Sequence, residues 1–121
     1  MIQFQKWYSC DRIIITDEAN NASVQVDLLK TENLKEHYKA DALIWALWVN
    51  EANRGCGVGK ALLKKAEELA LKKHCHEVAV EWDGRESDNW VHDWYERQGY
   101  DCKEFDSRSA LLVKDLRENN G

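Results

Sequence analysis

The sequence lacks several features that would assign it to a large functional class. It has no run of about 18 apolar residues, so no membrane-spanning helix is expected, and no charged-then-apolar signal segment opens the chain. The 121 residues carry a net charge of −5, whereas domains that bind nucleic acid through its phosphates usually have a basic face. We therefore expect a cytoplasmic protein with no membrane partner and no nucleic-acid partner.

Closely spaced cysteine pairs are also missing. The four cysteines show no Cys-x-x-Cys spacing, and a cytosolic chain would keep them reduced. The segment His74-Cys-His-Glu77 contains metal-ligating residue types, but neighbouring residues do not converge easily on one ion, and a structural zinc takes four ligands from well-spaced pairs. We therefore expect no metal and interpret this segment as the end of a helix.

The remaining composition is typical of a globular protein. Hydrophobic residues make up 44% of the sequence and charged residues 32%. A chain of 121 residues is long enough for one core and too short for two. We expect one domain over residues 1–121.

The most informative segment joins an apolar strand to a helix. Arg54 and three glycines at alternate positions, Gly55, Gly57 and Gly59, stand between an apolar run that ends at Val49 and a helical pattern. Glycine lets backbone N–H groups turn inward, and no Cβ blocks the approach of a phosphate. Because the positive end of the following helix faces the same loop, this order predicts a pyrophosphate pocket.

Two common nucleotide-binding motifs do not fit this spacing. A Walker loop needs four residues between its glycine and its Gly-Lys and then Ser or Thr, but three residues separate Gly55 from Gly59, and Ala61 follows Lys60. The dinucleotide motif needs Gly-x-Gly-x-x-Gly early in a βαβ unit, whereas this chain has Gly-x-Gly-x-Gly in its middle. Neither motif explains the loop.

A third pattern does fit. The segment Arg54-Gly-Cys-Gly-Val-Gly59, followed by Lys-Ala-Leu-Leu63, resembles the acyl-CoA loop of the GNAT superfamily of N-acetyltransferases. The segment Trp94-Tyr-Glu-Arg-Gln-Gly-Tyr100 resembles the same family's Phe-Tyr-Glu-Lys-x-Gly-Phe helix. The start of that helix departs by one residue, because Asp88 stands seven positions before Tyr95 and Asn89 is next to it. The resemblance covers residues 42–100.

The resemblance implies an α/β fold with a central mixed sheet, in which parallel middle strands splay apart and helices flank the sheet. The residue patterns predict matching elements. These are strands at 42–50 and 77–83, parallel because the helix at 58–73 crosses between them, a helix from Ser87 or Asp88 to Gln98, and antiparallel strands at 101–106 and 109–116.

The first 41 residues depart from the family pattern. They predict strands at 4–9, 12–16 and 23–30 and one short helix at 31–39. The usual enzyme has two helices after its first strand, which wall the acceptor slot, and this chain has no space for both. The acceptor side is then open, completed by a partner subunit in a homodimer, or reduced.

The resemblance also implies roles for individual residues. Backbone N–H groups of the loop would hold the pyrophosphate, and main-chain groups from Leu47 to Val49 would pair with the pantetheine arm. The Val49 N–H would stabilise the oxyanion, Tyr95 would protonate the leaving thiolate, and Asn89 rather than Asp88 is the candidate contact to the arm. The predicted acetyl-CoA contacts are Leu47, Trp48, Val49, Arg54, Gly55, Cys56, Gly57, Val58, Gly59, Lys60, Asn89 and Tyr95.

The general base has several candidates. Glu81 and Asp83 lie on the neighbouring strand, Glu51 and His92 are near in sequence, and a relay of water to the solvent is an alternative. We take Glu81 as the first candidate. Trp45 and Trp48 are expected on opposite faces of their strand because side chains alternate.

The function that the resemblance implies is transfer of an acetyl group from acetyl-CoA to a primary amine of a small molecule or peptide, by direct attack in a ternary complex. A regulatory or partner-recognition module of the same fold, which binds CoA without catalysis, is the alternative. A structural domain with an empty loop is a third.

Overall fold

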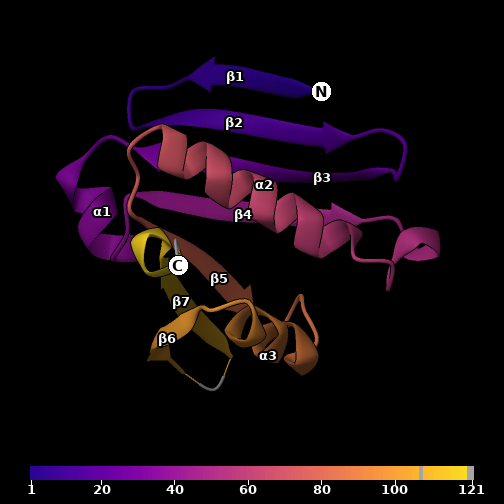
Figure 1. Cartoon of the computed structure of the whole chain (residues 1–121). Helices are drawn as coiled ribbons and strands as arrows, with labels where there is room; N and C mark the ends of the chain where they lie inside the picture. Colours follow the sequence, from indigo (N-terminus) through magenta and orange to yellow (C-terminus); the bar gives the residue numbers. More distant parts are fainter. Residues whose placement is uncertain (107, 120–121) are drawn as a thin grey trace.

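The computed structural model describes residues 1–106 and 108–119, which form one seven-stranded mixed sheet with helices on both faces (Figure 1). The strands run in the order β1-β2-β3-β4-β5-β7-β6. Their bounds are β1 Ile2–Lys6, β2 Cys10–Asp17, β3 Ala22–Leu29, β4 Ala42–Val49, β5 Glu77–Asp83, β6 Asp101–Phe105 and β7 Ser109–Asp115. The helices are α1 Glu32–Tyr38, α2 Val58–Lys72 and α3 Asn89–Arg97, with 3₁₀ turns η1 Glu51–Asn53 and η2 Leu116–Asn119.

The predicted fold class is confirmed. β4 and β5 are parallel, as the crossing helix α2 requires, and the other strand pairs are antiparallel. From α1 onward every α-helix and β-strand begins and ends within two residues of its predicted bounds, whereas the 3₁₀ turns η1 and η2 were not predicted. None of the helices in the described part of the chain has both the length and the apolar character that crossing a bilayer demands.

The first strand was predicted in the wrong place. The pattern predicted a strand at 4–9, whereas β1 is Ile2–Lys6 and the residues from Trp7 to Ser9 form the turn into β2. The Trp7 N–H donates to the Cys10 carbonyl at 2.9 Å, which closes this turn. Large apolar residues therefore occupy a turn that residue type alone does not reveal.

The sheet separates two apolar cores. The larger core lies beneath α2 and α3 and includes Ile13, Ile44, Leu63 and Leu112. On the opposite face, Leu34 and Tyr38 of α1 pack against a smaller core that includes Leu43 and Leu111. Because α1 is short, it covers only part of this second face. Trp45 and Trp48 remain 38% and 48% exposed.

The parallel strands separate soon after they meet. Within the described residues, β4 and β5 pair only at Ala42 with Val78 and at Leu43 with Ala79. Beyond that point β5 continues beside β7, and β4 continues beside β3 alone. The edge of β4 that faces β5 is therefore free from Ile44 onward.

A bulge in β4 changes which way its side chains face. Ala46 has a φ of 53°, and the register with β3 shifts so that Trp45 pairs with Gln25 and Trp48 with Ser23. Gln25 and Ser23 lie on the same face of β3, because side chains alternate along a regular strand. Trp45 and Trp48 therefore share one face, and the prediction of opposite faces is wrong because the bulge adds a residue.

Candidate functional site

The glycine loop runs from the end of β4 to the start of α2. Gly55 and Gly57 have φ values of 84° and 82°, in the left-handed region that favours glycine. A Cβ added at either residue would meet no atom within 4 Å, so the backbone conformation rather than space requires glycine there. Gly59 has an ordinary φ, and its added Cβ would lie 3.6 Å from Cγ2 of Val49, an ordinary contact.

Three hydrogen bonds hold the loop against the end of the sheet. The Asn50 N–H donates to the Asn21 carbonyl at 3.0 Å, and Asn53 Nδ2 donates to the Asn20 carbonyl at 2.7 Å. Arg54 Nε donates to the Val49 carbonyl at 2.9 Å. The Arg54 side chain thus closes the loop on β4, a positioning role that the motif did not predict.

The start of α2 leaves a row of backbone donors without partners. Gly57 is the N-cap residue, no side chain caps the helix, and its first turn holds no acidic residue. The first bond into the helix runs from the Ala61 N–H to the Gly57 carbonyl at 3.0 Å. Among the contacts of the described residues, the N–H groups from Gly55 through Lys60 find no acceptor. These donors stand at the positive end of a 15-residue helix, which suits an anion.

The free edge of β4 adjoins this row of donors. The Asn50 N–H donates to the carbonyl of Asn21, the residue just before β3. Hydrogen bonds alternate along an antiparallel pair, so the N–H of the preceding residue, Val49, points away from β3. β5 has already diverged on that side. The side chains of Leu47 and Val49 pack toward the core beneath α2, whereas Trp48 faces the opposite side.

Tyr95 comes from α3, which lies with the start of α2 at the end of the molecule where β4 and β5 point (Figure 1). Its side chain is 8% exposed and belongs to the larger core, with ring centroids 5.1 Å from Trp94 and 5.7 Å from Tyr100. The hydroxyl makes no hydrogen bond with the described residues. Among the described residues, His92 Nε2 is the one fully buried polar side-chain atom without a hydrogen-bond partner. The Tyr95 hydroxyl, which also has no partner, is therefore not fully buried. Burial raises the pKa of Tyr95 to about 12.

This raised pKa predicts a loss of stability in alkali. Tyr95 has a pKa of about 12 in the folded chain and about 10 in an unfolded chain. Below pH 10 both states keep the proton, and the free energy of unfolding has its full value. It falls as the pH rises toward 12, by about 2–3 kcal/mol. Chemical denaturation at stepped pH should show this fall, and Tyr95→Phe should make it shallower. An equally steep fall in the variant would contradict the prediction.

The start of α3 differs in detail from its prediction. Asp88 is the N-cap residue, but its side chain makes no capping hydrogen bond. Its Oδ2 accepts from Trp90 Nε1 at 3.2 Å, and its carbonyl accepts from Trp82 Nε1 at 3.0 Å. Asn89 is the first residue of the helix and is exposed, so its amide is accessible.

The base candidates lie in separate places. The Asp83 carboxylate accepts hydrogen bonds from Arg85 Nε at 3.2 Å and from Arg85 Nη2 at 3.1 Å. These hydrogen bonds lower the pKa of Asp83. Glu51 is exposed in η1. Glu81 is exposed on the face that α1 partly covers, where it lines a cavity of about 380 Å³ together with Tyr38, Phe105 and Ser109. Of the acidic candidates, Glu81 alone lines this cavity.

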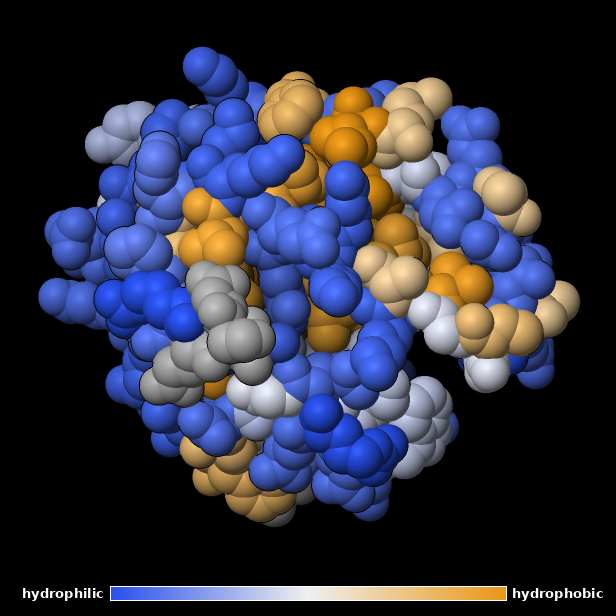
Figure 2. Space-filling view, in the orientation of Figure 1, coloured by the Kyte–Doolittle hydropathy of each residue, from blue (hydrophilic) through white to orange (hydrophobic). Residues whose placement is uncertain are grey.

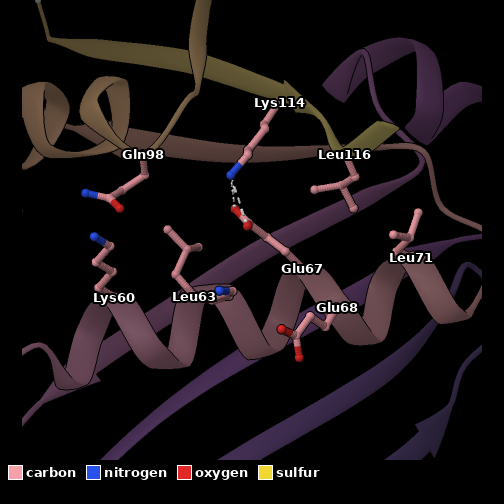
Figure 3. A pocket seen from close by; sticks show the side chains of 9 residues that line it. Lys60, Leu63, Glu67, Glu68, Leu71, Gln98, Lys114 and Leu116 are labelled. Carbon is pink, nitrogen blue, oxygen red and sulfur yellow. Dashed lines mark hydrogen bonds and ion pairs between the residues drawn. The ribbon is translucent and has the colours of Figure 1, made fainter. Parts of the chain in front are cut away.

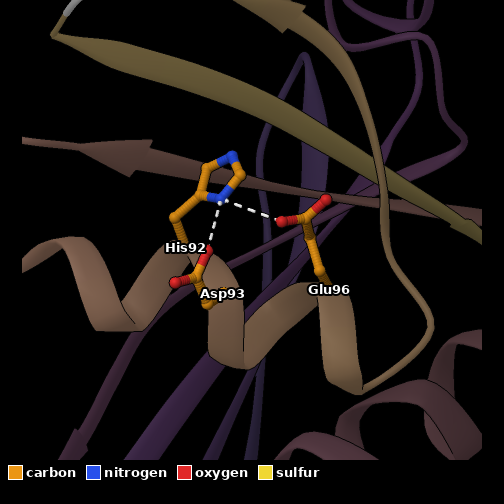
Figure 4. A group of neighbouring side chains, drawn as sticks. All are labelled: His92, Asp93 and Glu96. Carbon is orange, nitrogen blue, oxygen red and sulfur yellow. Dashed lines mark ion pairs between the residues drawn. The ribbon is translucent and has the colours of Figure 1, made fainter.

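His92 lies on α3 among its own helix neighbours (Figure 4). Its Nδ1 is 3.3 Å from Glu96 Oε1 and 3.6 Å from Asp93 Oδ1, and its ring meets Trp82 and Phe105 edge to face. The three side chains offer ligand atoms within 4.8 Å of one another, but both carboxylates are exposed. This arrangement is explained by a histidine that packs on Trp82 and contacts carboxylates on its own helix.

The segment from His74 to Glu77 connects α2 to β5. His74 and His76 are exposed, whereas Cys75 between them is buried and its burial raises its pKa to about 11. α2 ends at Lys72, so the segment follows the end of the helix rather than forming it: the His74 N–H donates to the Leu71 carbonyl at 3.0 Å, and Glu77 is the first residue of β5.

Gly57→Ala and Gly59→Ala form a matched pair for the loop. Gly57→Ala places a side chain at a φ of 82° and should lower the free energy of unfolding by about 1–2 kcal/mol. Gly59→Ala should be neutral or stabilise by up to about 1 kcal/mol, because alanine favours the helix and its Cβ has room. Thermal unfolding measures both effects. Equal losses in the two variants would contradict the requirement for glycine at residue 57.

Comparison with protein families agrees with this geometry. The model of the acetyltransferase (GNAT) family matches residues 30–100, which is more than half of the chain. The chain belongs to this family. Its glycine loop, the free edge of β4 and all of α3 lie within the matched region, so the resemblance inferred from the motifs is confirmed for this GNAT protein.

Solved structures show the same fold. The PaiA N-acetyltransferase from Thermoplasma acidophilum, in complex with coenzyme A, is 14% identical with a TM-score of 0.66, over 88% of this chain and 61% of that one. An acetyltransferase from Bacillus cereus ATCC 14579 is 17% identical with a TM-score of 0.64, over 94% and 74%. At these identities the likeness shows the fold alone. Curated protein sequences give no match.

Proposed function

We propose that this GNAT protein transfers an acetyl group from acetyl-CoA to a primary amine of a small molecule or peptide. The observation that carries the proposal is the row of unpartnered N–H groups from Gly55 through Lys60 beside the free edge of β4. A row of donors at a helix start suits a pyrophosphate, and a free strand edge suits an extended arm with amide groups. The family membership and the CoA bound to the PaiA relative support the same ligand.

Each part of the loop then has a task. The N–H groups of Gly55, Cys56, Gly57, Val58, Gly59 and Lys60 bind the pyrophosphate oxygens, and the hydrogen bond from Arg54 to the Val49 carbonyl keeps the loop in place. Main-chain groups from Leu47 to Val49 pair with the pantetheine arm as an added strand. Asn89, exposed at the start of α3, is the candidate side-chain contact to that arm.

The Val49 N–H is the proposed oxyanion donor. It points into the gap between the splayed strands, where the thioester carbonyl would lie at the end of an arm paired with β4. The amine nitrogen attacks this carbonyl carbon, negative charge develops on the oxygen, and the N–H stabilises it. The carbon–sulfur bond then breaks and the acetyl group remains on the amine.

Tyr95 is the proposed acid. As the carbon–sulfur bond breaks, its hydroxyl gives a proton to the thiolate, and the proton that the attacking nitrogen loses as the amide forms returns to the Tyr95 phenolate through water. A hydroxyl with a pKa of about 12 is protonated at neutral pH, and it has no competing hydrogen-bond partner among the described residues. The ammonium form of the acceptor must lose a proton before it attacks, and Glu81, in its cavity on the α1 face, is the candidate base.

Calorimetry with acetyl-CoA, followed by a free-thiol assay over a panel of primary amines, tests the proposal. We expect binding and thiol release that depends on the amine. An absence of binding at millimolar acetyl-CoA would overturn the proposal. Binding without thiol release for every amine would instead favour a CoA-binding module without catalysis.

A further inference from the structure

The two edges of the sheet differ in their chemistry. Three of the five residues of β6 are charged, Asp101, Lys103 and Glu104, and its register with β7 shifts between Cys102 and Glu104. Charges and bulges of this kind keep an edge strand from pairing with another chain. β1, the opposite edge, has the sequence Ile-Gln-Phe-Gln-Lys, pairs with β2 in one regular register, and carries its only charge at Lys6. β1 is the unprotected edge.

Large apolar side chains are exposed on this unprotected edge. Ile2 is 39% exposed and Phe4 62%. Trp7, 52% exposed, stands in the turn after the strand, with the Arg12 guanidinium 5.5 Å from its ring centroid. Figure 2 shows the apolar colour along the part of the surface where β1 lies in Figure 1. Phe4 pairs with the buried Ile13, so its ring lies on the α2 face, where Lys73 Nζ is 5.5 Å from the ring centroid. Ile2 and Phe4 share this face, and two exposed apolar side chains on an edge strand indicate a contact surface.

The backbone of β1 shows which groups are free. The Met1 amino group and the Thr16 N–H each donate to the other residue's carbonyl, and the Trp7 N–H donates to the Cys10 carbonyl. Hydrogen bonds alternate along an antiparallel pair, so the odd-numbered residues of β1 face β2. The N–H and C=O groups of Ile2, Phe4 and Lys6 therefore point outward, away from the sheet.

We propose that β1 pairs antiparallel with β1 of a second copy of this chain, which forms a symmetric dimer with one continuous sheet. The two-fold axis lies at Phe4, opposite the partner's Phe4, and Ile2 lies opposite the partner's Lys6. In this register every outward N–H and C=O of the strand meets its complement, because residues 2, 4 and 6 pair with residues 6, 4 and 2. The two Phe4 rings contact on the α2 face, and Gln3 meets the partner's Gln5 on the other face.

Self-pairing explains β1 better than pairing with a different edge. If β1 paired with β6 of another copy, each copy would keep one free edge and the copies would add to one another into a fibre. The charges and the bulge of β6 oppose this pairing. The net charge of −5 repels two copies in general, but β1 has no acidic residue and its Lys6 faces an apolar Ile2. The inference does not rest on the proposed function, because no residue of the glycine loop takes part.

Sedimentation velocity or light scattering of the chain over a roughly hundredfold range of concentration tests the dimer, since a short strand pair makes a small interface. We expect the mass to rise from 14.1 kDa toward twice that value. Phe4→Pro should leave a folded monomer, because it removes an outward N–H and no bond to β2. Phe105→Pro is the matched control, an equally exposed phenylalanine on β6, and should leave the dimer intact. A wild-type chain that is monomeric throughout, or a control that dissociates like Phe4→Pro, would overturn the proposal.

A charge pair tests the register and does not depend on proline. Phe4→Glu and Phe4→Lys should each be monomeric, because like charges then lie directly opposite each other. An equimolar mixture of the two should regain the dimer, because Glu and Lys face each other across the axis. Circular dichroism checks that each variant is folded. A dimer that persists in Phe4→Glu alone, or a mixture that stays monomeric, would overturn self-pairing at residue 4.

Discussion

Tyr95→Phe is expected to lower the rate of thiol release by about 10²- to 10⁴-fold, the usual contribution of a general acid, with little change in CoA affinity. The variant removes one oxygen and keeps the ring in the core beneath α2 and α3. Because the Tyr95 hydroxyl makes no hydrogen bond with the described residues, its loss leaves no buried group unpaired and folding should be nearly unaffected. The free-thiol assay measures the rate, and calorimetry measures the affinity.

Tyr100→Phe is the matched control for this experiment. Tyr100 lies 5.7 Å from Tyr95 between ring centroids, is 2% exposed, and donates its hydroxyl to Glu67 Oε2 at 2.8 Å. We expect this variant to lower the melting temperature and to leave the rate per folded molecule nearly unchanged. If Tyr95→Phe retains the wild-type rate, the acid is another group. If it loses CoA affinity in the same proportion, the hydroxyl contributes to binding instead.

Glu67→Ala is expected to lower the free energy of unfolding by about 2–4 kcal/mol. The Glu67 carboxylate accepts from the Tyr100 hydroxyl at 2.8 Å. It also accepts from Lys114 Nζ at 3.0 and 3.2 Å (Figure 3). The side chains of Glu67 and Lys114 are only 12% and 11% exposed. Removal of the carboxylate would leave a nearly buried ammonium group and a buried hydroxyl without an acceptor, and both are costly.

Glu68→Ala isolates this effect from the loss of a helix-surface carboxylate. Glu68 is the next residue of α2 (Figure 3), is exposed, and makes no hydrogen bond with the described residues. Its replacement should change stability by less than about 0.5 kcal/mol. Urea denaturation of both variants measures the difference. A cost below about 1 kcal/mol for Glu67→Ala would show that water satisfies Lys114 and Tyr100 as well as the carboxylate does.

The sequence by itself determined the features that depend on neighbouring residues. The glycines at 55 and 57 indicate a turn with positive φ. The apolar spacing of residues 58–72 indicates a helix with one buried face, and the alternation at 77–83 indicates a strand. The family motif lies in such local segments, so both the loop and the helix of Tyr95 could be located from the residues alone. Placement of β1 failed because strand and turn there have the same residue types.

Only the tertiary structure decided the features that depend on partners far apart in the chain. The bulge at Ala46 appears in the register between β3 and β4. It places Trp45 and Trp48 on the same face of the sheet, although alternation along the strand predicted opposite faces. The family resemblance implied that β4 and β5 splay apart, but only the structure shows that β5 leaves β4 after two pairs and frees its edge from Ile44 onward. Glu67 of α2, Tyr100 between α3 and β6, and Lys114 of β7 meet only in the folded chain. These features all depend on contacts between segments that are distant in the sequence. Such contacts are determined by packing and hydrogen bonding in the folded chain rather than by local propensity.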